Sequence, residues 1–170
     1  MKIKAFTLIE FIITMAVAAI FIMVAVPGFY NVMQNNKITS MTNQLAASIN
    51  YARLEAIKRG YRVSVCSASN ASLTTCGTAA QWSQGWMVFN DPDNDNIIDA
   101  VTDLVKVSEA VPSNMVITAN SNIISFDGSG FLLSVPITIS LSALDCTGLN
   151  ARVLSVTSSG RLTVARTQCP

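Results

Sequence analysis

The chain contains no histidine, and only 12% of its 170 residues are charged. The most common general base of enzymes is therefore missing, as is the histidine of a mixed Cys/His zinc site. A serine or cysteine nucleophile needs a base beside it, and the scattered Lys37, Lys58 and Lys106 form no cluster that could serve as one. The formal net charge is +1, which implies no overall attraction for a polyanion. We expect a protein that is not an enzyme and has no cofactor.

Charge is scarcest near the N-terminus. From Phe11 to Tyr30 no side chain is charged, and about 20 helical residues span about 30 Å, the thickness of a bilayer's hydrocarbon core. Lys2 and Lys4 lie at the start of the apolar segment, and residues 1–9 contain no acidic side chain. Because basic flanks stay in the cytoplasm, we expect a single-pass protein of the inner membrane with a cytoplasmic N-terminus and a periplasmic domain.

The chain has four cysteines, Cys66, Cys76, Cys146 and Cys169. An even number in an exported domain indicates disulfides, and three connectivities are possible. We favour Cys66–Cys76 and Cys146–Cys169, because each pair closes a local loop rich in Ser, Thr, Asn or Gly.

The segment "AFTLIE", followed by about 20 apolar residues, resembles the class III signal of type IV pilins and type II secretion pseudopilins. The resemblance implies that a prepilin peptidase removes residues 1–5 by cutting between Ala5 and Phe6, and that it methylates the new amine of Phe6. The family usually has Gly before the cut, where this chain has Ala5. The resemblance assigns the helix in the membrane and filament core to residues 6–30 and the globular pilin domain to 31–170.

Glu10 is the single carboxylate of the apolar segment, and such a charge is costly in hydrocarbon unless it is paired. The resemblance gives it an assembly role: it would pair with the amine of Phe6 on an adjacent subunit and set the register of subunits in the filament. Pro27 and Gly28 fit the same family, because Pro and Gly kink a helix and allow it to melt locally.

The rest of the chain predicts an α+β fold, in which a long N-terminal helix packs on an antiparallel β-sheet or small sandwich, as in the lollipop-shaped pilins. Apolar residues at 41, 45, 49, 52 and 56 extend the helix to Arg59, with Gly60 as its cap and with Arg53 and Arg59 exposed. Beyond it the apolar period becomes two. We expect strands over 61–66, 85–90, 103–110, 115–119, 122–126, 130–134, 137–143, 151–156 and 161–165.

The order of these strands and turns is similar to the GspH/FimT/FimU branch of minor pilins and pseudopilins. We therefore expect a FimU-like minor pilin at or near a pilus tip, whose partners are other pilins, prepilin peptidase and the inner membrane. Three alternatives stay open: a FimT-like pilin that binds DNA for natural transformation, the type II secretion pseudopilin H, and an unrelated anchored binding domain whose N-terminus stays uncut.

Two clusters could bind ligands. Asp91, Asp93, Asp95 and Asp99 lie in "DPDNDNIID", where alternating carboxylates can bind calcium. The loop lacks the glycine and the glutamate of an EF-hand, so a solvated turn is favoured and no metal is assigned.

The C-terminal hairpin carries Arg152, Arg161 and Arg166, which could contact DNA phosphates in a salt-dependent way. In the FimT group a Gly-Arg-x-Arg sequence at this place resembles a DNA-binding signature, but the second arginine is absent here, so ordinary surface arginines are favoured. Arg152 and Arg166 are expected to meet across the hairpin.

We interpret Trp86 as a core residue and Trp82 as loop packing.

Overall fold

The computed structural model describes residues 7–170, and for residues 24–28, 30 and 31 it describes the backbone alone. The predicted leader, the Ala5–Phe6 bond and Phe6 itself lie outside the described residues. The chain forms two compact units, 1–37 and 38–170, which are treated separately. Among the helices built from described residues, none has the length and apolarity needed to cross a membrane.

A single helix, α1 (Leu8–Arg59), begins in the first unit and ends in the second. Thr7 and Glu10 form a capping box at its start: the Glu10 N–H donates to Thr7 Oγ1, and the Thr7 N–H donates to Glu10 Oε2, both at 3.4 Å. The helix is continuous through Pro27 and Gly28, so a kink or local melting at this point stays a prediction.

In the second unit, the predicted apolar face of α1 is buried. Leu45, Ile49, Ala52 and Ala56 are at most 1% exposed, while Met41 is only partly buried. The helix ends as predicted at Gly60, which adopts a φ of +73° and donates its N–H to the Ala56 carbonyl.

The expectation that Arg53 is exposed is wrong. Its side chain is half-buried, and its guanidinium donates to the carbonyl oxygens of Gly130 (2.9 Å) and Ser159 (3.1 Å). Arg53 therefore fastens the helix to two loops. Arg59 is exposed as expected, and it pairs with Glu55.

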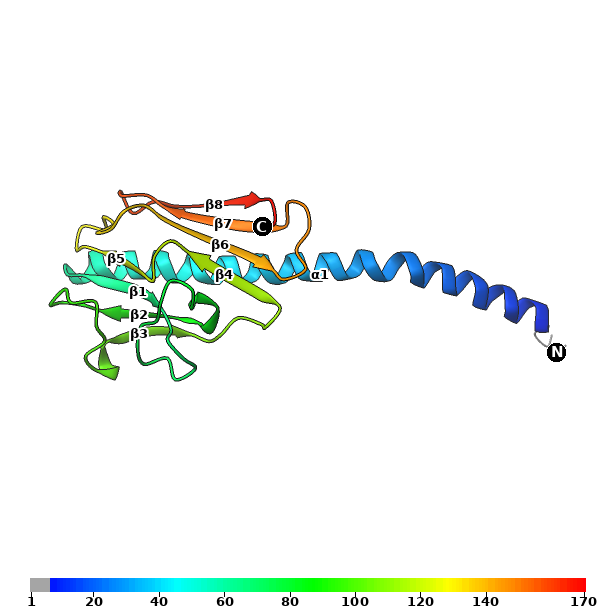
Figure 1. Ribbon diagram of the computed structural model, residues 1–170, viewed down its shortest axis with the longest axis horizontal. Coiled ribbons are helices and arrows are strands. Elements are labelled where there is room, and N and C mark those ends of the chain that lie inside the picture. The colour runs from blue at the N-terminus through cyan, green and yellow to red at the C-terminus, as the bar shows by residue number, and fades with distance from the viewer. Residues whose placement is uncertain (1–6) are drawn as a thin grey trace, which may run out of the picture. The chain divides into compact units, whose positions relative to one another are not determined.

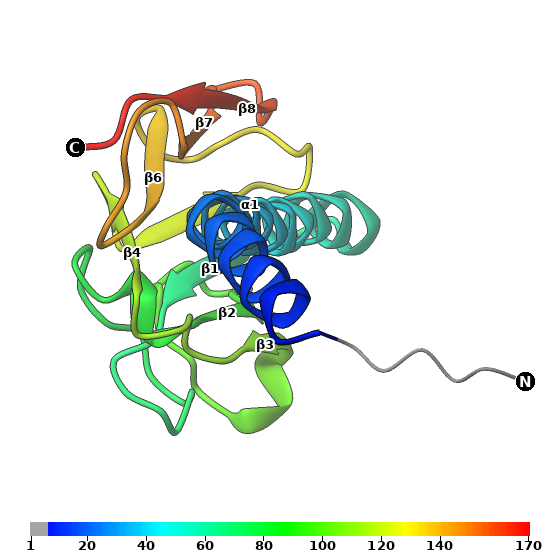
Figure 2. The ribbon, with the colours of Figure 1, turned by 90° about the vertical axis from the view of Figure 1, so that its right-hand side faces the viewer.

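Eight strands form two antiparallel four-stranded sheets (Figure 1). The first has the order β3-β2-β1-β5 and the second β4-β6-β7-β8. The strands are β1 (Val63–Ser67), β2 (Trp86–Asn90), β3 (Leu104–Ser108), β4 (Met115–Ala119), β5 (Ile123–Phe126), β6 (Ile137–Ala143), β7 (Ala151–Val156) and β8 (Leu162–Thr167). In Figure 2, β6, β7 and β8 lie above the 38–59 part of α1, and β1, β2 and β3 lie below it; one core joins the helix and both sheets.

The predicted strand over 130–134 is wrong. Only Leu132 forms a bridge, with Phe126, and the Asp127 side chain accepts hydrogen bonds from the N–H groups of Ser129 and Phe131. These bonds hold the segment in a turn, which the apolar letters "FLL" did not reveal.

Both tryptophans are core residues. Trp86 is 1% exposed as expected, and Trp82 is fully buried, with its indole N–H donating to the Ser121 carbonyl at 2.8 Å. Trp82 is therefore more deeply buried than the interpretation as loop packing implied.

Candidate assembly and partner-binding sites

The start of α1 carries the only acidic side chain between Thr7 and Lys37. Every side chain from Thr7 to Met23 is exposed, including large apolar ones such as Leu8 (77%) and Met23 (76%). The carboxylate of Glu10 accepts hydrogen bonds from the N–H and the hydroxyl of Thr7, both at 3.4 Å. These bonds are long, so the carboxylate is only weakly held by its own helix.

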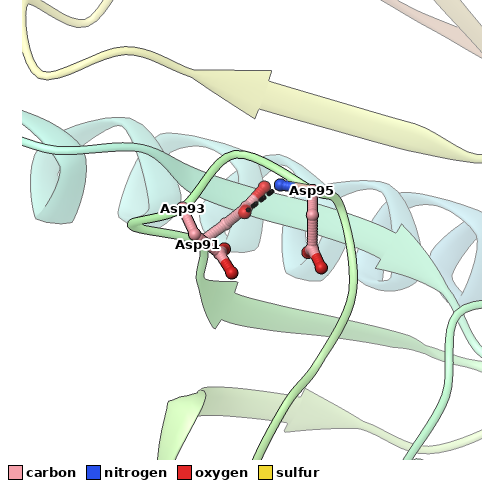
Figure 3. Close-up of side chains that lie close together, drawn as sticks. All are labelled: Asp91, Asp93 and Asp95. Atoms are coloured by element: carbon pink, nitrogen blue, oxygen red, sulfur yellow. Dashed lines mark hydrogen bonds between the residues drawn. The ribbon is translucent and has the colours of Figure 1, made fainter.

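The acidic loop brings three of the four predicted aspartates together (Figure 3). One carboxylate oxygen each from Asp91, Asp93 and Asp95 lies within 4.8 Å of the others, whereas Asp99 is not part of this group. Repulsion from Asp93 and Asp95 raises the pKa of the Asp99 carboxyl. The three oxygens are ligands of the kind a hard cation prefers.

Asp91, however, is already bound by its own protein. It is 1% exposed; its Oδ2 lies 3.2 Å from Nε of Arg62, and its Oδ1 accepts the N–H of Asp95, the dashed bond in Figure 3. Burial raises the pKa of Asp91, and the Arg62 guanidinium opposes that rise. Arg62 neutralises the one buried carboxylate of the loop, so Asp91 has its partners within the protein and needs no cation. Calcium binding stays a prediction.

The three arginines of the C-terminal hairpin differ in burial: Arg152 is buried, and Arg161 and Arg166 are exposed. Arg152 and Arg166 are cross-strand partners between β7 and β8, as expected, and Arg161 is exposed just before β8. Arg152 is 6% exposed, and its guanidinium donates to the carbonyls of Asn150 and Ala151 and to the hydroxyl of Thr39. Burial first, and the charge of Arg166 second, lower the pKa of Arg152. The burial of Arg152 argues against a DNA contact by this side chain, and DNA contact by the hairpin arginines stays a prediction.

The cysteines form the two pairings that the sequence favoured, Cys66–Cys76 and Cys146–Cys169. The first lies within a second small apolar cluster on β1 and β2, and the second ties the C-terminal tail to the loop after β6. The sequence analysis missed Arg62 and Arg53, because their partners lie 29 and 77 residues further along the chain. No short motif signals such pairs.

Comparison with known proteins identifies relatives of this arrangement. A family model described as "Type II transport protein GspH" matches residues 41–160. No match was found among curated proteins. The crystal structure of the type IV minor pilin FimU of Pseudomonas aeruginosa is similar, with 18% identity, a TM-score of 0.60 and coverage of 76% of this chain and 89% of FimU.

The minor pseudopilin EpsH of the type 2 secretion system of Vibrio cholerae is also similar, with 10% identity, a TM-score of 0.52 and coverage of 76% of this chain and 97% of EpsH. At such identities the likeness shows a shared fold, a helix packed on antiparallel sheets. Because the family match also spans more than half of the chain, this protein belongs to the GspH family and is a minor pilin or pseudopilin of the GspH/FimU kind.

Proposed function

We propose that this chain is a minor type IV pilin, a structural subunit without enzymatic activity, which joins the tip or initiation complex of a pilus. The observation that carries the proposal is the exposed apolar surface of α1 from Leu8 to Met23. Soluble proteins rarely expose so continuous an apolar surface, so another apolar phase must cover it. In a pilin that phase is first lipid and then the helices of neighbouring subunits.

The anchor is proposed from the sequence. The uncharged run from Phe11 to Tyr30 would hold the precursor in the inner membrane, with its domain in the periplasm. A periplasmic location agrees with the two disulfides, which persist in oxidising compartments. Prepilin peptidase would then cut between Ala5 and Phe6 and methylate Phe6.

Glu10 is the proposed docking group. Its two bonds to Thr7 come from uncharged donors and are long, at 3.4 Å, whereas a bond to an ammonium would be shorter and would add the attraction between two opposite charges. An amine on the Phe6 of an adjacent subunit would therefore displace Thr7 at little cost. Such an exchange would select one axial register for the incoming subunit.

The choice of a pilus over a secretion system rests on similarity. FimU gives the higher TM-score and identity, 0.60 and 18%, against 0.52 and 10% for EpsH. A DNA-uptake role is not favoured, because only Arg161 and Arg166 of the three hairpin arginines reach the surface.

The test is deletion of the gene in its own host, followed by complementation with the wild type, Glu10→Gln, or Thr14→Val as a matched control in the same helix. Surface pili, type II secretion and DNA uptake are measured in each strain. We expect deletion and Glu10→Gln to reduce surface pili and to spare secretion, while Thr14→Val behaves as wild type. Loss of secretion with normal pili would replace this proposal by the pseudopilin role, and loss of DNA uptake alone would replace it by the DNA-binding role.

A further inference from the structure

The two sheets have four edge strands, and the protein protects three of them. On β5, the Ser121 hydroxyl accepts the N–H of Ile123 and donates to its carbonyl, and the N–H of Leu133 donates to the Ser125 carbonyl. These contacts use hydrogen-bonding groups that an added strand would need. The edge is therefore blocked by its own chain.

The edges of β4 and β3 are protected in other ways. On β4, the N–H of Ile117 donates to the hydroxyl of Ser83 at 2.8 Å. Strand β3 carries Lys106 and pairs with β2 through a register shift at Val88/Phe89. A lysine and a bulge on a short edge strand are common devices against unwanted strand pairing.

Strand β8 pairs with β7 without a register shift, and its one charged side chain is Arg166. The N–H of Thr157 donates to the Arg161 carbonyl at 3.0 Å, so this pair is of the hydrogen-bonded type. Since the type alternates along an antiparallel pair, the backbone N–H and C=O groups of Leu162, Val164 and Arg166 point away from β7. No group within residues 7–170 forms a hydrogen bond to this outer edge.

The open edge also carries charge that its own chain does not neutralise. Arg166 stands directly opposite Arg152 in a pair of the other type, in which side chains lie closest. Like charges at such positions repel one another. Arg166 is exposed, and no acidic side chain among the described residues forms an ion pair with it.

We propose that the outer edge of β8 binds an extended segment of another protein subunit, which adds a strand to the second sheet and places a carboxylate beside Arg166. Unpaired N–H and C=O groups at every second residue are complementary to a β-strand, and a guanidinium is complementary to a carboxylate. Thr163 and Ala165, which face the other side, are small and uncharged, so that side offers no charge for a partner to pair with. The inference rests on the proposed role as an assembly subunit and names the surface that a neighbour uses.

The experiment uses the full chain, labelled with ¹⁵N, in detergent micelles. The probe is a short capped peptide of alternating Thr and Val with one central Glu, and the control peptide has Lys in place of Glu. Amide hydrogen exchange is followed by NMR. We expect the Glu peptide to slow exchange at Leu162, Val164 and Arg166 and to leave Thr163 and Ala165 unchanged, because β7 already protects them.

Variants test the two parts of the site. Arg166→Gln should weaken binding of the Glu peptide about fivefold, whereas Arg161→Gln, which removes the same charge outside the strand, should leave it unchanged. Val164→Pro removes an outward N–H and should abolish binding, with the exchange of β7 amides as the check on folding. If this variant unfolds the hairpin, Arg166→Glu takes its place and should bind the Lys peptide more tightly than the Glu peptide.

Two results would overturn the inference: no slowing at Leu162, Val164 and Arg166 at any soluble peptide concentration, or equal binding of the Glu and Lys peptides. Duplex DNA is tested in parallel at two salt concentrations. If DNA, and not the peptide, shifts the signals of Arg161 and Arg166 in a salt-dependent way, the edge is a phosphate-binding face instead. None of these outcomes depends on whether the strain makes pili, so this inference and the proposed function can fail separately.

Discussion

The two sheets of the domain differ in what covers them. In the first sheet, all five residues of β1 and four of the five residues of β2 are buried. Val65 and Val88 belong to the main core with α1, while Cys66, Met87 and Phe89 form a second cluster on the opposite face. Both faces of the first sheet are therefore shielded from solvent at β1 and β2, one by the helix and the other by loops.

In the second sheet one face is covered and the other is largely open, with only Ser142 and Ala151 buried on it. Ile137, Ile139 and Leu141 of β6 are fully buried, and they alternate with Thr138 and Ser140, which lie on the other face. That face carries neither a charge nor a side chain larger than valine. Its residues are Val116, Thr118, Thr138, Ser140, Ser142, Ala151, Val153, Ser155, Thr163, Ala165 and Thr167. The first sheet is thus covered on both faces, whereas the second has a largely open face and an open edge.

The largest effect on the free energy of unfolding should come from truncating a side chain in the second apolar cluster, on β1 and β2. Phe89→Ala removes a fully buried ring and should lower the free energy of unfolding by about 3–5 kcal/mol. The matched change on the open face, Val153→Ala, should cost less than about 1 kcal/mol. Urea unfolding of the full chain, followed by the fluorescence of the buried Trp82 and Trp86, measures both. Equal losses would mean that the two sheets do not differ in this way.

The next effect concerns the disulfide of the covered sheet. Changing Cys66 and Cys76 together to Ser should lower the free energy of unfolding by about 2–4 kcal/mol, because the unfolded chain gains freedom and a buried site becomes polar. Changing Cys146 and Cys169 to Ser should instead release the tail and speed amide exchange at Thr167, with β1 still protected. Loss of protection in both sheets from the second pair of changes would contradict the assignment.

A smaller effect depends on pH. The hydrogen bond from Arg59, at 2.7 Å, is the main cause that lowers the pKa of Glu55 below its ordinary 4.5. A lowered folded-state pKa stabilises the protein above the ordinary value, and this contribution is lost as the pH falls through the folded value. Glu55→Gln should therefore lose stability at neutral pH and have a flatter profile below about pH 4.5. Parallel profiles for the two proteins, from urea unfolding at several pH values, would show that Glu55 is not held by Arg59.

The smallest effect is expected on the open face. Thr138 is exposed on β6, and its side chain has no partner among the hydrogen bonds of the described residues. Thr138→Ser should change the free energy of unfolding by less than about 0.5 kcal/mol. A loss as large as that of a core truncation would mean that this face is covered in the full chain.

These differences also show what sequence patterns can predict. The alternation in "ITISLSA" correctly predicted β6, and the 45/49/52/56 spacing predicted the packed part of α1. "VSVCS" alternates in the same way, yet all of β1 is buried, because distant loops cover its polar side and Ser64 bonds to Asp91 and Ser125. Alternation predicts which residues share a face of the sheet, but it does not predict what covers that face.

The candidate sites follow the same rule. The three clustered aspartates and the Arg152–Arg166 pair were predicted from spacing along neighbouring residues and a hairpin. The burial of Arg152 was missed, because it depends on Thr39, more than a hundred residues away in the chain. The open edge of β8 was also missed, since an edge is defined by the order of strands and by the absence of a neighbour.

The most direct test of the central claim is the mass of the N-terminal peptide of this chain, purified from the membranes of its own host. Processing as a pilin predicts a chain that begins at Phe6 with one added methyl group on its amine, so that Glu10 lies one helical turn from the new charge. A strain without prepilin peptidase should give a chain that still carries residues 1–5. If the wild-type strain also keeps those residues, the chain is not processed as a pilin, and the assembly role proposed for Glu10 is contradicted.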